Sequence, residues 1–110
     1  MSKFDDFLDM VLQGVGDLAS ETLGDVPQQA LADTRDFLDF AQGQLREMTG
    51  ELEGGDLSFD EFTELARDLE HLATLVALSS LGILKTKLER FRSGLIDLVV
   101  NSAKTVFLPG

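Results

Sequence analysis

The chain has 110 residues, no cysteine and a formal net charge of −11 at pH 7, from 20 acidic and nine basic side chains. Its length and its 44% hydrophobic content are those of one globular domain, so residues 1–110 are expected to form a single unit that is neither disordered nor fibrous. Disulfides, thiolate metal sites and cysteine nucleophiles are excluded, and an acidic surface argues against direct nucleic acid binding because it repels phosphates.

The charge is divided unevenly along the chain. Residues 1–70 hold four basic and eighteen acidic side chains, whereas residues 71–110 hold five basic and two acidic ones. Four of the five basic residues in the second part fall within eight positions: Lys85, Lys87, Arg90 and Arg92. The two parts of the chain are therefore electrostatically complementary.

The first ten residues and the longest uncharged run indicate where in the cell the protein is expected. The first ten residues, MSKFDDFLDM, place acids where a secretory signal needs basic residues and then an apolar run, so a cytoplasmic protein is expected. The longest uncharged run, residues 72–84, is shorter than the roughly 20 residues needed to span a bilayer, so no transmembrane segment is expected. Peripheral membrane contact has weak support, because Trp and Tyr are absent and only the basic cluster would face lipid.

Two amphipathic helices are predicted in the first half. Apolar residues at three- and four-residue spacing predict helices over 3–24 and 27–49, separated by Gly24 and restarted by Pro27. Gly14 and Gly16 indicate either close approach of a neighbouring helix or a weak point in the first helix. Gly50 is expected to cap the second helix, and residues 51–56 to form a loop.

The segment after this loop has two interpretations. Residues 55–62 resemble the second half of an EF-hand loop, but the earlier ligand positions would fall on Gly50, Leu52 and Gly54, which have no side-chain oxygen. Ser58 and Glu61 have the spacing of a capping box, which predicts that a third helix begins at residue 58.

A polar stripe on the third predicted helix is the candidate metal site. Glu64, Asp68 and His71 are spaced to share one face, and Asp68 and His71 resemble a fragment of the ferritin-like di-iron motif. That family needs two such motifs and two further glutamates, whereas this chain has one histidine, which only a symmetric dimer could duplicate. A solvated face is favoured, and no metal or cofactor is expected.

The architecture depends on residues 72–84, LATLVALSSLGIL. A turn near residues 79–82 would end the third helix at 80 and start a fourth over 83–107, which gives a small antiparallel four-helix bundle. In the alternative, one long helix over 58–107 joins two shorter helices and buries its apolar face in an oligomer. The all-α bundle is favoured.

No catalytic constellation is found in the sequence. The single histidine, the lack of a Gly-x-Ser-x-Gly turn and the lack of a glycine-rich phosphate loop predict a non-enzymatic protein.

The leading hypothesis is a structural or interaction protein that assembles with itself or docks on a larger complex. It would use surplus apolar surface of residues 72–84 and 95–108, because a helix that is apolar all round must be covered. One alternative is an acidic inhibitor that mimics nucleic acid for a basic partner through acids such as Asp33, Asp36, Asp39 and Glu47; the other is the metal-binding bundle centred on Asp68 and His71. The residues expected to contact the partner are Leu75, Leu78, Leu81, Leu84, Leu98 and Phe107.

Overall fold

The computed structural model describes residues 2–108, and over this range it is helical with no strand. The predicted all-α helical bundle is confirmed. The elements are α1 (Lys3–Leu23), α2 (Pro27–Gly54), α3 (Phe59–Asp68), the 3₁₀ turn η1 (Leu69–Leu72), the single-turn α4 (Val76–Ser79) and α5 (Lys85–Phe107).

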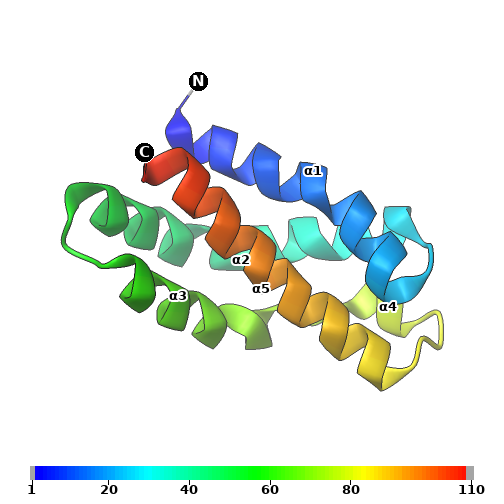
Figure 1. The fold of residues 1–110 in the computed structure, drawn as a ribbon. Helices are drawn as coiled ribbons and strands as arrows, with labels where there is room; N and C mark the ends of the chain where they lie inside the picture. The colour runs from blue at the N-terminus through cyan, green and yellow to red at the C-terminus, as the bar shows by residue number, and fades with distance from the viewer. Residues whose placement is uncertain (1, 109–110) are drawn as a thin grey trace.

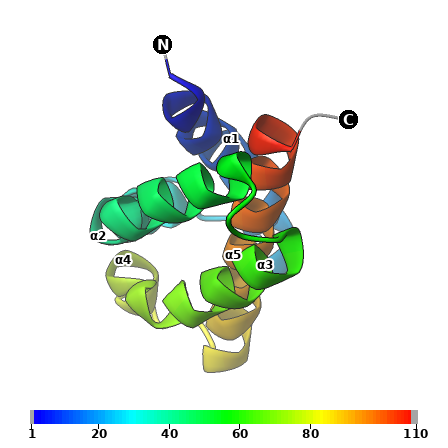
Figure 2. The ribbon, with the colours of Figure 1, turned by 90° about the vertical axis from the view of Figure 1, so that its left-hand side faces the viewer.

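The long helices α1, α2, α3 and α5 alternate in direction along the chain (Figure 1). The α1–α5 pair makes the most extensive contact, and α5 crosses the molecule so that it packs on α3 as well (Figures 1 and 2). The body measures 42 × 25 × 22 Å. Four phenylalanines, Phe7, Phe37, Phe62 and Phe91, are fully buried, so one core joins all four long helices.

The ends of α1 follow the local sequence signals. The Ser2 hydroxyl accepts the backbone N–H of Asp5, which satisfies one of the free donors at the helix start. The helix ends at Gly24, whose φ of 83° is readily adopted only by glycine. The predicted stop at Gly24 and restart at Pro27 are both confirmed.

Helix α2 extends beyond its predicted end. It continues through Gly50 to Gly54 and is capped by Gly55, which has a φ of 83° and donates its backbone N–H to the carbonyls of Glu51 and Leu52. The predicted cap at Gly50 and most of the predicted loop over 51–56 are therefore wrong. The extension places Leu52 in the core, which favours helix over loop for this turn.

The third predicted helix begins as expected but does not reach residue 80. Ser58 and Glu61 form both hydrogen bonds of the capping box. The helix then changes to η1 and is interrupted before α4, at Leu75, whose φ of 55° is left-handed. The long-helix alternative over 58–107 is wrong, because this interruption and the turn before Lys85 reverse the chain.

Two contacts hold this interruption. The Asp33 carboxylate on α2 accepts the backbone N–H groups of Ala77 and Leu78, at 2.9 and 2.8 Å. The Arg92 Nε on α5 donates to the carbonyl of Ala73 at 2.8 Å. These polar contacts fix the segment from both sides, and Leu75 and Leu78 are buried as a result.

Candidate functional site

Exposed apolar side chains concentrate in one short stretch of the molecule. Val76, Leu81 and Leu84 are 67%, 47% and 65% exposed, although they lie within nine residues of one another in the chain. Within residues 2–108, the other large apolar side chains that are exposed are scattered over α2, α3 and the C-terminal end: Phe40, Leu65 and Leu108. Single exposed leucines are ordinary on protein surfaces, whereas a group of them marks an interaction site.

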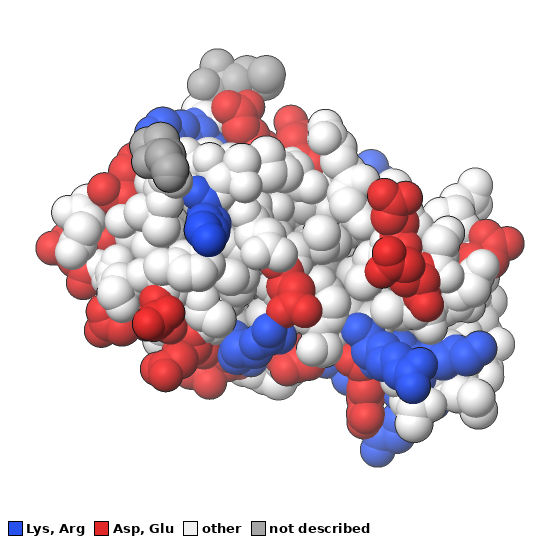
Figure 3. All heavy atoms as spheres, viewed as in Figure 1, with Lys and Arg blue, Asp and Glu red and all other residues white. Residues whose placement is uncertain are grey.

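Basic side chains border this apolar group. Lys85 and Lys87 lie in the first turn of α5, which has no acidic residue in that turn, and both are exposed. Lys and Arg gather in Figure 3 where α5 begins, at the lower right, whereas Asp and Glu dominate the left edge. We call Val76, Leu81, Leu84, Lys85 and Lys87 the α4–α5 corner. The positive end of the α5 dipole adds to the lysines, so this corner is positive on an acidic molecule.

The six residues predicted to contact a partner separate into two groups. Leu81 and Leu84 lie at the α4–α5 corner, and Leu98 is half-buried between α1 and α5. Leu75, Leu78 and Phe107 are buried within the chain and do not form part of its surface. The ring of Phe107 packs edge-on against Phe7, with 5.9 Å between the ring centroids. The surplus apolar surface is therefore smaller than the sequence predicts.

A groove of about 350 Å³ separates α2 from α3, which lie next to each other in Figure 2. Its apolar part contains Met48, Leu69 and Leu65, of which Leu65 is 41% exposed. Its polar part carries one amide side chain, carboxylates from both helices and the only histidine of the chain: Gln44, Glu47, Glu51, Asp68 and His71. We call this the α2–α3 groove. The apolar periodicity of the sequence placed these residues on separate helices but did not predict that the acidic residues of the two helices would line one groove.

The candidate metal ligands do not assemble into a metal site in this groove. The His71 Nδ1 lies 2.7 Å from the backbone carbonyl oxygen of Asp68, so it contacts its own helical turn. Glu64 is exposed and does not line the groove. Across residues 2–108, no three His, Cys, Asp or Glu side chains are grouped so that they could hold a metal ion.

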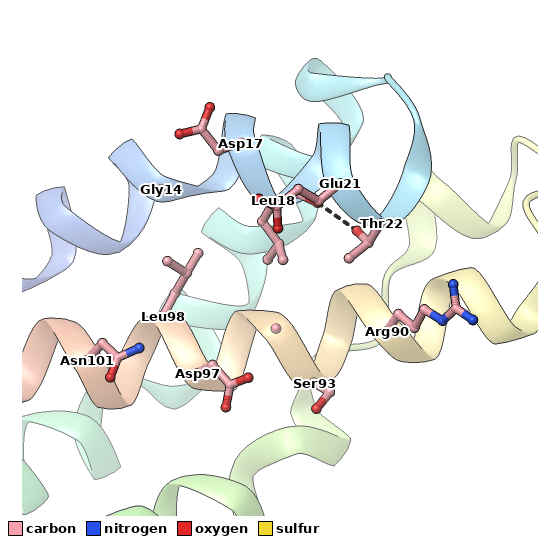
Figure 4. Close-up of a pocket in the computed structure, with 11 residues that line it drawn as sticks. Gly14, Asp17, Leu18, Glu21, Thr22, Arg90, Ser93, Asp97, Leu98 and Asn101 are labelled. Atoms are coloured by element: carbon pink, nitrogen blue, oxygen red, sulfur yellow. Dashed lines mark hydrogen bonds between the residues drawn. The ribbon is translucent and has the colours of Figure 1, made fainter.

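A second groove, of about 590 Å³, runs between α1 and α5. Leu18 and Leu98 point across it toward the opposite helix, and Asp17, Glu21 and Arg90 lie along its edges (Figure 4). The Thr22 hydroxyl donates to the carbonyl of Leu18, so it is engaged in its own helix. The groove includes Ser93, whereas the only histidine of the chain, His71, lines the α2–α3 groove.

The acids proposed to mimic nucleic acid differ in exposure. Asp36, Asp39 and Glu47 are exposed on α2. Asp33 is buried and its carboxylate caps α4. Asp33 therefore cannot contribute to an acidic binding face.

Comparison of the chain with protein-family models, with curated proteins and with solved structures finds no significant match. In residues 2–108, none of the helices combines the length and the apolar character needed to cross a membrane.

Proposed function

We propose that this chain is a non-catalytic interaction protein that docks on another molecule through the α4–α5 corner. The observation that carries this proposal is that three large apolar side chains within nine residues of the chain, Val76, Leu81 and Leu84, are each at least 47% exposed. Covering a side chain of this size is worth about 1.5–3 kcal/mol when its burial is complete. A partner that covers all three side chains would gain a contribution of this kind from each of them.

The location of the corner supports a docking role over a folding role. Leu75 and Leu78 face inward and complete the core, whereas Leu81 and Leu84 lie beyond them in the turn that leads into α5. The turn reverses the chain without burying either leucine. Lys85 and Lys87 follow Leu84 directly in the first turn of α5 and are exposed, which favours an acidic partner surface.

Photo-crosslinking tests this proposal with the full chain. A photoreactive amino acid replaces Leu84, and in a matched variant it replaces Gln13, which is exposed on α1. We expect discrete protein adducts from position 84 and none from position 13 when the purified chain or its native cell extract is irradiated. Equal adducts at both positions would overturn the proposal, and adducts at neither position would overturn docking on a protein.

A further inference from the structure

We infer that the α4–α5 corner of one copy docks into the α2–α3 groove of a second copy of this chain. The inference rests on the proposed function and names the partner surface that the corner recognises. The corner and the groove share no residue, so each copy presents both. The complementarity between them has an apolar part and a charged part.

The apolar part matches protruding residues to a recess. Leu81 and Leu84 project from the turn before α5, whereas Met48, Leu65 and Leu69 line the groove between α2 and α3. The groove volume of about 350 Å³ is within the usual size of concave binding sites. Docking would also cover Leu65, which is 41% exposed at the groove.

The charged part matches in sign. Glu47, Glu51 and Asp68 border the groove, and Lys85 and Lys87 border the leucines of the corner. Two copies, each with a net charge of −11, repel one another in most orientations. When the corner docks into the groove, Lys85 and Lys87 of one copy face the carboxylates of the other. This attraction favours that orientation over the orientations in which two acidic surfaces meet.

The same charges make a second copy the better occupant than an anionic membrane. A lipid surface has no recess for Leu81 and Leu84 and would face the acidic body on either side of the corner, whereas the groove provides both carboxylates and a recess. Two copies can exchange the contact reciprocally and close as a dimer, or pass it from copy to copy in a chain. The small apolar area predicts weak association, with a dissociation constant of about 1–100 μM.

Sedimentation velocity of the full chain, between about 1 μM and 1 mM, tests the inference through charge reversal. The variant K85E/K87E reverses the corner, and E47K/E51K reverses the groove. We expect each to weaken self-association by about tenfold or more, because attractive pairs become repulsive ones. Combining all four substitutions in one chain, or mixing the two variants, should restore association, because opposite charges face each other again.

The matched control is D36K/D39K, which makes the same charge change on exposed positions of α2 outside the groove. It should associate at least as well as the unaltered chain, because it lowers the net repulsion without touching the contact. A second variant, L81S/L84S, removes the apolar contact and should weaken association without disturbing the helical circular dichroism signal.

The outcomes separate this inference from the proposed function. Failure of the fourfold variant and of the mixture to regain association would overturn the inference, as would an unaltered chain that stays monomeric to about 1 mM. In either case, adducts from position 84, or flotation with phosphatidylglycerol-containing vesicles that K85E/K87E abolishes, would leave the corner as a docking site for a different partner. Absence of both the adducts and the flotation would overturn the proposed function as well.

Discussion

Leu98 of α5 lies directly over Gly14 of α1, and a Cβ added to Gly14 would lie only 2.6 Å from Cδ2 of Leu98. The relationship is repeated with the roles of the helices exchanged, since a Cβ on Gly94 would lie 2.4 Å from Cδ1 of Leu18. Each helix thus offers a glycine to a leucine of the other, which allows the backbones to approach closely. Of the two interpretations of Gly14, close approach is confirmed, whereas a Cβ added to Gly16 would meet no other part of the chain within 4 Å.

This difference predicts that alanine at the two positions changes the free energy of unfolding by different amounts. Gly16→Ala should raise the free energy of unfolding by about 1 kcal/mol, because alanine is the better helix former and the site is open. Gly14→Ala should be less stable than Gly16→Ala by about 1 kcal/mol or more, because the new methyl group displaces the Leu98 side chain. Urea denaturation monitored by circular dichroism measures both.

The control is the same pair of substitutions in a Leu98→Ala background. Shortening Leu98 removes the overlap, so the two alanine variants should then gain similar stability. Equal gains with Leu98 intact would contradict the close contact.

Asp33 provides a second prediction, because its carboxylate satisfies two backbone donors of α4. Asp33→Ala should lower the free energy of unfolding by about 2–3 kcal/mol, since it leaves the buried N–H of Leu78 without an acceptor. The exposed Asp36 on the same helix is the matched control, and Asp36→Ala should change stability by less than about 0.5 kcal/mol. Chemical denaturation of both variants gives the comparison.

Hydrogen exchange locates this effect. The amides of Ala77 and Leu78 should exchange faster in Asp33→Ala than in the unaltered chain, because the segment between η1 and α5 loses its attachment to α2. Unchanged protection at these two amides would show that Asp33 does not hold α4.

The contribution of Glu61 to the stability of the chain should depend on pH. Hydrogen bonds from the backbone N–H and the side chain of Ser58 lower the pKa of Glu61 below its ordinary value of 4.5. Because the pKa of Glu61 is lower in the folded chain than in the unfolded chain, the ionised carboxylate stabilises the fold. This contribution is fully present above the pKa of the unfolded chain and is lost as the pH falls through the pKa of the folded chain. The stability difference between the unaltered chain and Glu61→Gln should therefore be constant above about pH 5 and should shrink below pH 4.5.

Thermal denaturation at a series of pH values measures this difference. Glu64→Gln is the matched control, because Glu64 is exposed on the same helix but lies outside the capping box. A difference that grows toward acid pH would contradict the role of Glu61 in the cap.

The sequence predicted where the first three long helices begin, because local signals decide those positions. The apolar periodicity, Gly24 with Pro27, and the Ser58–Glu61 box place the starts of α1, α2 and α3 within a residue of their positions. The interruption after α3 could not be predicted, because it depends on Asp33 bonding to amides 44 and 45 residues away. A leucine at position 75 also carries no signal for a left-handed φ, a conformation that usually favours glycine.

The candidate site was predictable only in part for the same reason. The lack of charge over 72–84 identified an apolar stretch, but which leucines are buried depends on where α2 and α5 hold the chain. Leu75 and Leu78 face the core once Asp33 and Arg92 fix the segment, and Leu81 and Leu84 remain outside. The α2–α3 groove required the pairing of two helices that periodicity alone does not specify.

The last prediction separates folding from docking within this stretch. Leu78→Ala should cost about 2–5 kcal/mol of stability, because its side chain is fully buried and leaves a cavity. Leu84→Ala should change stability by less than about 0.5 kcal/mol, because Leu84 is 65% exposed. Denaturant titration compares the two variants, and sedimentation of the folded Leu84→Ala chain should show weaker self-association. Equal destabilisation by both would mean that Leu84 belongs to the core of the chain, and the corner would then lose the side chain on which its docking role chiefly depends.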